Sequence, residues 1–488
     1  MRKIAALEKS VKLRPHQDAF IKKYLNNNGQ QIAYHGLGSG KTITSLGAVE
    51  KSNSKSALVL TPAALQKNYT DSIQKFVTPK DRAKYHVMSY EKFRMNPDKY
   101  VDEYKPDTMV VDEFHRDKDP KSVSYNAIKK ARPRIKNFMG LTGTTIQNTP
   151  NEIFPLLNLV SNKDNKLLNG KQFEEKYIKK EKVYPKGISG IYARLTGRFG
   201  EKKVLTNTAD LKKQIAPYVD KNVPTKEFLS NFPKRIEKDI EVPMTGEQEK
   251  RYNYFMSKDL GFIDRWRIKH DIPPKARDAK NFFSKLTHSR EVSNTPAALS
   301  EGNIKDPIKS SGKLTVAYKD LAEHLKANPL HKAMVYSNFT ESGLSPFQQA
   351  LEHDKIPYGV FSGKVKRKAK NQDVADYNTG KKRVLLVSPS GAEGLDLKGT
   401  TLEQNIDKSW NPAKNEQVIG RAIRFKSHDA LPPEMRKVEV RNYYSTIKPG
   451  FFRRLFGKKP TPTIDQYISH RAKEKQELNN QFDELLNQ

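Results

Sequence analysis

Short apolar runs, separated by longer polar and mixed stretches, are the clearest pattern along this chain. They form two sets, the first at Gln31–Tyr34, Ala57–Leu60, Thr108–Val111 and Phe138–Leu141, and the second, much later, at Ala333–Tyr336 and Val384–Val387. Each run is bounded by turn residues or by a helical stretch, which is typical of buried parallel strands covered by helices. The pattern therefore predicts an α/β fold.

The stretch between the two sets, roughly Ser161 to Ser310, is basic, contains prolines and is poor in buried-strand runs. It predicts helical insertions and a linker. Near the C-terminus, Thr463 and Gln466 have the spacing of a capping box at the start of a helix. Four apolar residues then fall on one helical face, and we expect this face to pack against the core: Ile468, Leu478, Phe482 and Leu485.

The charge balance points to a partner. The 488 residues include 89 Lys and Arg against 55 Asp and Glu, a formal net charge of +34. Nucleic acid is the commonest polyanionic partner of such a chain, while a solvated basic surface and anionic lipid are the alternatives. There is no cysteine, no apolar run of eighteen residues and no secretory signal pattern. We therefore expect no disulfide, no membrane span and a cytoplasmic location.

The segment His35–Thr42 has the composition of a nucleotide phosphate loop. It follows a predicted strand and opens a predicted helix, where backbone N–H groups and the helix dipole favour phosphate. The candidate contacts come from Gly38, Ser39, Gly40, Lys41 and Thr42, with Lys41 neutralising phosphate charge and Thr42 ligating Mg²⁺. His35 stands where the full pattern has a glycine, so a chance glycine turn is the alternative.

Two adjacent carboxylates follow the predicted strand Thr108–Val111. Asp112 is placed to hold Mg²⁺ through water, and Glu113 to orient or deprotonate an attacking water. Ending a buried strand in two charges is costly unless the charges have a function. A surface turn is the alternative interpretation.

The glycine loop together with Asp112–His115 resembles the superfamily-2 helicases. Further blocks in the same order resemble the Swi/Snf-type branch of that family, and Leu141–Asn148 is the most specific of them. These blocks are Leu13–Gln17, Ala57–Pro62, His86–Glu91, Leu141–Asn148, Ser311–Leu314, Ser337–Thr340, Ser388–Leu397 and Gln417–Arg424. The resemblance implies two tandem RecA-like parallel-sheet lobes with helical insertions between them. The expected divisions are residues 1–160 for lobe 1, 161–245 for an insertion and the end of lobe 1, 246–310 for an insertion and linker, and 311–488 for lobe 2 with the C-terminal helix.

The resemblance also implies roles for individual residues around ATP and Mg²⁺. Gln17, with Arg14 beside it, would read adenine, while Arg421 and Arg424 would act as arginine fingers, accompanied by Gln417. Gly394 and Asp396 would belong to the second lobe's part of the ATP site. The residues expected to contact nucleic acid or to couple it to ATP are Thr61, Pro62, Thr142, Gly143, Thr144, Asn338 and Ser388.

The second lobe departs from the chromatin-remodelling members of the branch. Gly420–Arg424 reads Gly-Arg-Ala-Ile-Arg rather than Gly-Arg-Ala-His-Arg, and the segment Ser427–Val438 resembles the poxvirus nucleoside triphosphate phosphohydrolase I type. The resemblance implies a viral or phage protein, in the cytoplasm of a host cell or associated with the virion. We expect an ATP-dependent helicase or translocase, acting as a monomer on the phosphate backbone of duplex or branched DNA together with replication, recombination or transcription proteins.

Other functions stay open at this point. The motor could instead serve viral transcription termination and RNA release, and a non-enzymatic basic DNA-binding virion protein or a packaging motor are further alternatives. Two basic segments are also ambiguous. The charge run Lys364–Lys370 is either a solvated helix or a DNA-contacting face, and Phe451–Lys459 is either a wedge on DNA or tucked against the core.

Overall fold

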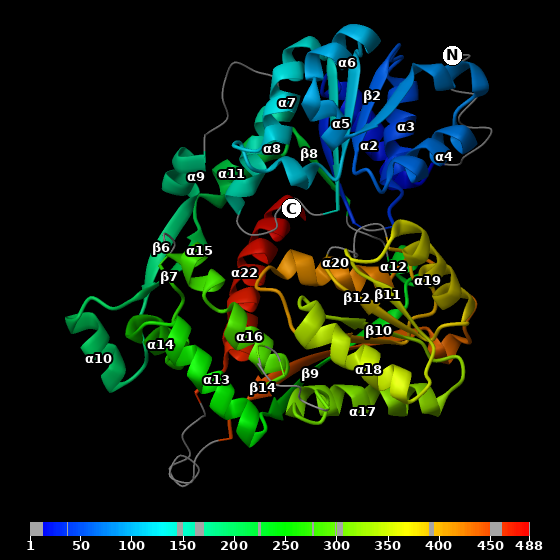
Figure 1. Ribbon diagram of the computed structural model, residues 1–488. Helices are drawn as coiled ribbons and strands as arrows, with labels where there is room; N and C mark the ends of the chain where they lie inside the picture. The colour runs from blue at the N-terminus through cyan, green and yellow to red at the C-terminus, as the bar shows by residue number, and fades with distance from the viewer. Residues whose placement is uncertain are drawn as a thin grey trace. The chain divides into compact units, whose positions relative to one another are not determined.

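The computed structural model describes residues 13–36, 38–143, 150–161, 170–222, 226–275, 278–297, 299, 306–389, 395–448 and 461–487. The chain forms two compact units (Figure 1). Unit 1 contains Met1–Lys179, Val204–Leu229 and Glu477–Gln488, and unit 2 contains Lys180–Lys203 and Ser230–Gln476. The main segment of unit 2 runs from Ser230 to Gln476, whereas the second lobe was expected over residues 311–488.

Among the described residues, unit 1 contains a six-stranded sheet in the order β3-β2-β4-β5-β1-β8, and its strand pairs are parallel. The strands are β1 (Gln30–His35), β2 (Ala57–Thr61), β3 (Tyr85–Ser89), β4 (Thr108–Asp112), β5 (Asn137–Thr142) and β8 (Val219–Asn222). The helices are α2 (Pro15–Asn26), α3 (Lys41–Lys51), α4 (Gln66–Phe76), α5 (Tyr90–Met95), α6 (Pro97–Tyr104), α7 (Val123–Ala131), α8 (Ile153–Ser161), α9 (Gly170–Tyr177), α11 (Thr208–Ile215) and α12 (Lys226–Leu229).

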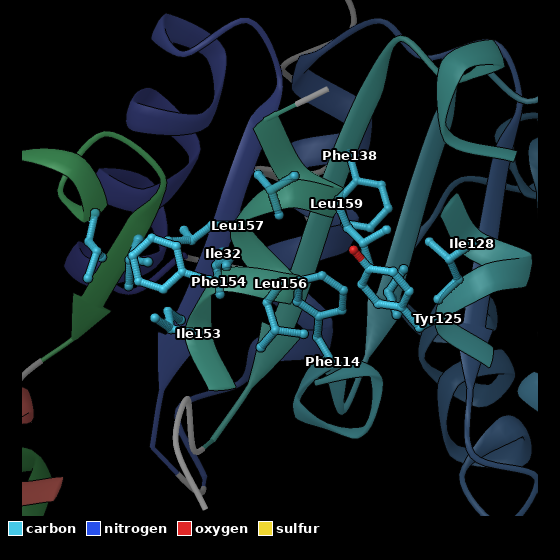
Figure 2. Close-up of a cluster of buried hydrophobic side chains, with 14 of the residues drawn as sticks. Ile32, Phe114, Tyr125, Ile128, Phe138, Ile153, Phe154, Leu156, Leu157 and Leu159 are labelled. Atoms are coloured by element: carbon cyan, nitrogen blue, oxygen red, sulfur yellow. The ribbon is translucent and has the colours of Figure 1, made fainter. Parts of the chain in front are cut away.

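Helices cover both faces of this sheet, which explains why its central strands are apolar throughout. On one face, side chains of α2, α3 and α4 form a core with Ala33, Val59, Val110 and Met139. On the other face, α7 and α8 pack over Ile32 and Phe138, together with Phe114 from the turn after β4, as Figure 2 shows. Every residue of β2, β4 and β5 is buried.

Unit 2 repeats this arrangement with a different strand order, β11-β12-β10-β13-β14-β9 among the described residues, again with parallel pairs. The strands are β9 (Lys234–Pro243), β10 (Ala333–Tyr336), β11 (Tyr358–Phe361), β12 (Val384–Val387), β13 (Leu402–Asn405) and β14 (Lys437–Thr446). The helices are α13 (Gly246–Asp259), α14 (Phe262–Lys269), α15 (Ala279–Ser284), α16 (Thr287–Asn294), α17 (Gly312–Ala327), α18 (Ser345–His353), α19 (Arg367–Thr379) and α20 (Pro412–Ala422).

A smaller two-stranded sheet joins β6 (Ile178–Val183) to β7 (Gly200–Leu205), with α10 (Ile188–Leu195) between the strands in sequence. The last helix, α22 (Ile464–Asn487), begins in unit 2 and ends in unit 1. The predicted capping box is present, since Gln466 accepts the backbone N–H of Thr463 at 3.0 Å and its own N–H reaches the Thr463 hydroxyl at 3.4 Å. All four residues of its predicted apolar face are buried.

The six predicted strands are confirmed, and so is the α/β class with two parallel sheets. The helical insertions expected between Ser161 and Ser310 are present as α9 to α16, and the same stretch also contains the strands β6, β7, β8 and β9. Strand β9 also places Lys234–Pro243 in the sheet of unit 2, before the expected start of the second lobe at Ser311. Edge strands carry charge to avoid pairing with other chains, and β9 has six charged residues out of ten, so it shows no apolar run.

No helix within the described residues is long and apolar enough to cross a membrane.

Gly140 on β5 is required by a close approach. A Cβ built there would lie 2.2 Å from Cδ1 of Phe114, whose ring packs on the sheet and lies 5.5 Å from that of Phe138. We predict that Gly140→Ala lowers the free energy of unfolding by about 1–3 kcal/mol, the usual cost of overpacking a core. Urea unfolding measures this, with Gly246→Ala as control because a Cβ at Gly246 meets nothing within 4 Å. Equal stability of the two variants would contradict the prediction.

Candidate nucleotide-binding site

The glycine loop between β1 and α3 has the backbone geometry of an anion-binding turn. Gly38 and Gly40 have φ angles of +75° and +81°, which side-chain-bearing residues rarely adopt. A Cβ at Gly40 would also lie 2.6 Å from the Gln17 amide nitrogen. Helix α3 begins directly after the loop, at Lys41, so the unsatisfied N–H groups of its first turn belong to the same site.

Three side chains at the start of α2 hold the carbonyl groups of this loop. Arg14 donates to the Gly38 carbonyl at 3.4 Å, His16 to the Ser39 carbonyl at 2.9 Å, and Gln17 to the Ser39 and Gly40 carbonyls at 3.3 and 3.2 Å. In a planar trans peptide the carbonyl and the following N–H point in opposite directions. The N–H groups of Gly40 and Lys41 are therefore turned away from α2.

The Lys41 ammonium lies inside the loop. It donates to the carbonyls of His35 and Gly36 at 2.9 and 3.3 Å. The Ser39 hydroxyl, 1% exposed, has no hydrogen-bond partner among the described residues. A phosphate group would supply acceptors for both donors, and the loop therefore fits a nucleotide phosphate.

His35, the residue in place of the first glycine, is fully buried. Its Nε2 donates to Asp220 on β8 at 2.9 Å, and Asp220 also accepts from Lys23 at 3.0 Å. Burial opposes ionisation of Asp220, but the hydrogen bonds from His35 and Lys23 outweigh it and hold the pKa of the carboxyl below its usual value. This pair ties the start of the loop to the edge strand of the sheet, which a glycine could not do.

Asp112 lies at the carboxyl end of β4 and is held from two sides. Its carboxylate accepts from the Thr61 hydroxyl at 3.1 Å and from the Glu113 backbone N–H at 3.0 Å. Burial and the neighbouring Glu113 charge raise the pKa of Asp112 to about 6, although Lys41 acts in the opposite direction. A buried carboxylate with raised pKa needs a further cation to be fully ionised.

These donors fit Mg²⁺. The ion prefers hard oxygen ligands and uses only one or two protein groups when phosphate and water complete its shell. Asp112 and the hydroxyl of Thr42 would provide them, and Asp112 would become fully charged on binding. Within the described residues there is no group of three or more His, Asp or Glu that could hold a metal by itself.

Glu113 follows Asp112 in a left-handed conformation, with φ of +52°. Such a conformation is uncommon for a residue with a side chain and is found at functional sites, where the surrounding packing enforces it. Here the next residue, Phe114, is fully buried against Gly140 and anchors the turn. The Glu113 side chain is 30% exposed, so water can reach its carboxylate.

His115 links this turn to the end of β5. Its Nδ1 lies 3.1 Å from the Thr142 hydroxyl and 3.4 Å from the Glu113 carboxylate. Burial lowers the pKa of His115 to about 4 despite the opposing charge of Glu113, so the ring is neutral near pH 7. Thr142 is fully buried, and the adjacent Gly143 is half-buried.

The candidate residues of unit 2 are placed on and after α20. Gln417 and Arg421 lie one helical turn apart, and Arg424 follows the end of the helix. The Nε of Arg424 lies 3.5 Å from the carboxylate of Asp396, so these two predicted residues are brought together. Ser388 is buried after β12, where its backbone N–H donates to the Phe361 carbonyl at 3.1 Å.

The predicted contacts of Thr61, Pro62 and Asn338 with nucleic acid and of Gln17 with adenine stay predictions, and the structure shows what these side chains contact in the protein. The side chains of Thr61 and Pro62 are buried, and the Thr61 hydroxyl donates to Asp112. The Asn338 side-chain amide donates to Asp407 at 2.7 Å. The Gln17 amide nitrogen is directed at the phosphate loop, and its oxygen accepts the Arg14 N–H at 2.9 Å, which leaves the adenine contact a prediction.

Some predicted positions lie outside the described residues: Thr144, Gly394 and the segment Phe451–Lys459. The basic run Lys364–Lys370 is described. It is largely exposed, and Lys364 forms an exposed ion pair with Glu341. Exposure fits both the solvated helix and the DNA-contacting face, so both interpretations stay predictions.

Sequence reasoning missed the buried Asp407 after β13. Its carboxylate accepts from Ser337, from Asn294 at 3.0 Å and from the Asn338 backbone N–H at 2.9 Å. Asp220 was also missed, 185 residues from its partner His35. Neither residue belongs to a local motif, so no sequence signal marks it.

His16 and His115 were not singled out as site residues either. Both lie within family motifs, and their positions next to Gln17 and close to Glu113 in sequence could have identified them.

A glycine loop between a parallel strand and a helix, with a Thr-supported carboxylate at the end of a neighbouring strand, defines a nucleoside-triphosphate-hydrolysing lobe of the P-loop class. Three family models match this chain. They are described as SNF2-related domain, over residues 82–298, helicase conserved C-terminal domain, over residues 316–426, and type III restriction enzyme, res subunit, over residues 10–147.

Individual proteins agree with these matches. A putative ATP-dependent RNA helicase of Acanthamoeba polyphaga mimivirus is 27% identical, over 98% of this chain and 97% of its own length. A termination factor NPH-I homolog of African swine fever virus is 24% identical over 93% of this chain and 75% of its own length. The DNA repair and recombination protein RAD54 of Oryza sativa is 24% identical over 84% of this chain and 48% of its own length.

Among solved structures, the SWI2/SNF2 ATPase core of Sulfolobus solfataricus in complex with dsDNA is similar over 98% of this chain and 96% of its own chain, with 16% identity and a TM-score of 0.37.

The family models and the sequence relatives agree that the chain is an SNF2-related helicase of superfamily 2, an ATP-dependent enzyme. The resemblance found in its motifs is thereby confirmed.

Gln17 has two possible roles, positioning the phosphate loop and reading adenine, and a substitution can distinguish them. If Gln17 positions the phosphate loop, Gln17→Ala raises KM for ATP and GTP equally, by about tenfold, because two hydrogen bonds of about 0.5–1.5 kcal/mol each are lost. If Gln17 reads adenine, only the preference for ATP over GTP falls. Steady-state hydrolysis of both nucleotides measures this. We expect the equal loss, and a selective loss would show that the amide turns toward the base.

The buried neutral His115 predicts a pH dependence of stability. The unfolded chain binds a proton near the ordinary pKa of 6.5, whereas the folded chain binds one only near 4, so folding loses stability as pH falls through this window. Between pH 7 and pH 5 we expect a loss of about 2 kcal/mol from this group. Urea unfolding of wild type and His115→Gln at both pH values measures it. An equally steep pH dependence in the variant would contradict the assignment.

Proposed function

We propose that this protein is a viral or phage motor that couples ATP hydrolysis to movement along duplex DNA. The observation that carries the proposal is the SNF2-related match over residues 82–298 of a chain with a net charge of +34. Phosphate contacts position a protein on DNA without reading its sequence, which suits a motor that must move along any sequence. The viral origin is supported by the mimivirus and African swine fever virus relatives.

In unit 1, each step of hydrolysis has a candidate group. Lys41 and the loop N–H groups hold the β- and γ-phosphates, while Thr42 and Asp112 would bind Mg²⁺, which stabilises charge on the phosphates. Glu113, exposed to water beside neutral His115, would orient the attacking water and accept its proton. His115 and Thr142 would transmit the state of this turn to the end of β5.

For unit 2, we propose that Arg421 and Arg424 stabilise the charge that develops on the γ-phosphoryl group. Planar guanidinium groups suit this role, because each can donate two parallel hydrogen bonds to phosphate oxygens. The contact of Arg424 with Asp396 would orient its side chain before nucleotide binds. Gln417, one turn before Arg421, would assist in positioning.

A second candidate is a motor that releases RNA at the end of viral transcription. The relative named as a termination factor matches 93% of this chain and 75% of its own length, whereas the one named as a repair and recombination protein matches 84% of this chain and 48% of its own length. The termination role therefore receives support from nearly the whole chain. The repair and recombination relative also matches most of this chain, but about half of its own length has no counterpart here.

The primary experiment measures ATP hydrolysis with duplex DNA, branched DNA, single-stranded DNA, RNA or no nucleic acid. We predict strong stimulation by duplex or branched DNA, and a loss of at least about 100-fold in Glu113→Gln, the usual cost of removing a general base. Displacement of a third strand from a DNA triplex then tests movement. Hydrolysis that no nucleic acid stimulates would contradict the motor.

The termination role has its own readout. A stalled elongation complex of a viral RNA polymerase is incubated with the protein and ATP, and free RNA is measured. Release that needs ATP and is absent with Glu113→Gln would favour termination. Triplex displacement without RNA release would favour replication or recombination.

A further inference from the structure

The helix α10 shows the reverse of the usual distribution of large and small side chains. Its small residues Gly190 and Ala193 face inward, where both are buried and a Cβ at Gly190 would lie 2.2 Å from the Pro185 carbonyl oxygen. Its large apolar residues face solvent: Ile191 is 60% exposed, Tyr192 49% and Leu195 82%. These three positions lie on one side of the helix.

A second group of exposed apolar residues continues this surface. Phe262 and Ile263, at the start of α14, are 64% and 49% exposed. Arg198 joins the two groups, since its guanidinium lies 5.3 Å from the Tyr192 ring and 5.6 Å from the Phe262 ring. Figure 1 shows α10 and α14 side by side. We name Ile191, Tyr192, Leu195, Phe262 and Ile263 the α10 face.

Single exposed apolar residues are normal on a protein surface, but a contiguous group marks an interaction site. The α10 face does not serve folding, because the inward side of the helix already packs through its small residues. Exposing three aliphatic chains and two aromatic rings together lowers solubility and offers nothing to a monomer. The arrangement therefore points to a partner that covers this face.

The charge around the α10 face indicates what kind of partner it is. From Ile178 to Leu205 there are eight Lys or Arg and two Glu, a net charge of +6 (8 − 2). Lys182, Lys186 and Arg194 are exposed near α10. A complementary partner is apolar at its centre and acidic at its rim. Nucleic acid would match the charge, but Ile191, Leu195 and Ile263 are aliphatic and cannot stack on bases as aromatic rings do.

We propose that the α10 face binds an acidic amphipathic segment of a partner protein, independently of the motor's own contacts with ATP. The segment lays its apolar side chains on Ile191, Leu195 and Phe262, and its carboxylates meet the surrounding Lys and Arg. A short helix is the natural form of such a segment, because its apolar stripe matches a two-turn helix in length. The surface would attach the motor to the complex on which it acts.

The probe is a fluorescein-labelled helical peptide with a leucine stripe flanked by glutamates, and its binding to the full-length protein is measured by fluorescence anisotropy. We expect saturable binding, at least about tenfold weaker in Ile191→Ser/Leu195→Ser, as for the central residues of an interface. Lys186→Glu/Arg194→Glu should weaken binding similarly. The matched control is Leu330→Ser, which changes an equally apolar residue, 50% exposed, elsewhere in unit 2.

Two companion measurements decide between classes of partner. A peptide in which lysines replace the glutamates should not bind, and Ile191→Ser/Leu195→Ser should keep the wild-type affinity for 30-nucleotide single-stranded DNA, for duplex DNA and for phosphatidylserine vesicles. Unchanged ATP hydrolysis would show that the variant is folded. The proposal is overturned if the peptide binds wild type and variant equally or not at all, or if the variant loses affinity for DNA or vesicles instead.

Discussion

The parallel direction of neighbouring strands is the constraint on which the site in unit 1 depends. Because β1, β2, β4 and β5 run the same way, their carboxyl ends lie along one edge of the sheet. His35, Thr61, Asp112 and Thr142 are the last residues of these strands. Groups that are far apart in sequence therefore meet within a few ångströms, and the glycine loop, Asp112 and Glu113 become one site.

This arrangement requires polar groups at the end of an apolar sheet, and each of them is stabilised by a partner. His35 is paired with Asp220, Asp112 with Thr61, and His115 with Thr142. Unpaired, each would cost about 1–3 kcal/mol of desolvation. The pairs also fix the orientation of these side chains in the absence of nucleotide. Preorganised groups of this kind lose little energy to rearrangement during the reaction.

Unit 2 uses the same principle for a different purpose. Asp407 follows β13, and its buried carboxylate accepts hydrogen bonds from Ser337 and Asn338 at the end of β10 and from Asn294 on α16. This network fixes Ser337 and Asn338 at the end of β10. The α10 face lies outside both sheets, and its exposed apolar residues can vary without disturbing them. The enzyme thus separates groups that must be rigid from a surface that can be adapted to a partner.

The sequence by itself determined the six apolar strands, the phosphate loop, the carboxylate pair and the cap of α22, because each is a local pattern whose spacing the backbone geometry dictates. It did not reveal β9, since an edge strand is charged where an inner strand is apolar. It also could not assign Asp220 to His35, Thr61 to Asp112 or Asp407 to Asn338, because strand order decides which distant residues meet. Which face of α10 is buried was likewise decided only by the tertiary structure, since Gly190 and Ala193 pack inward only where the chain around Pro185 closes against them.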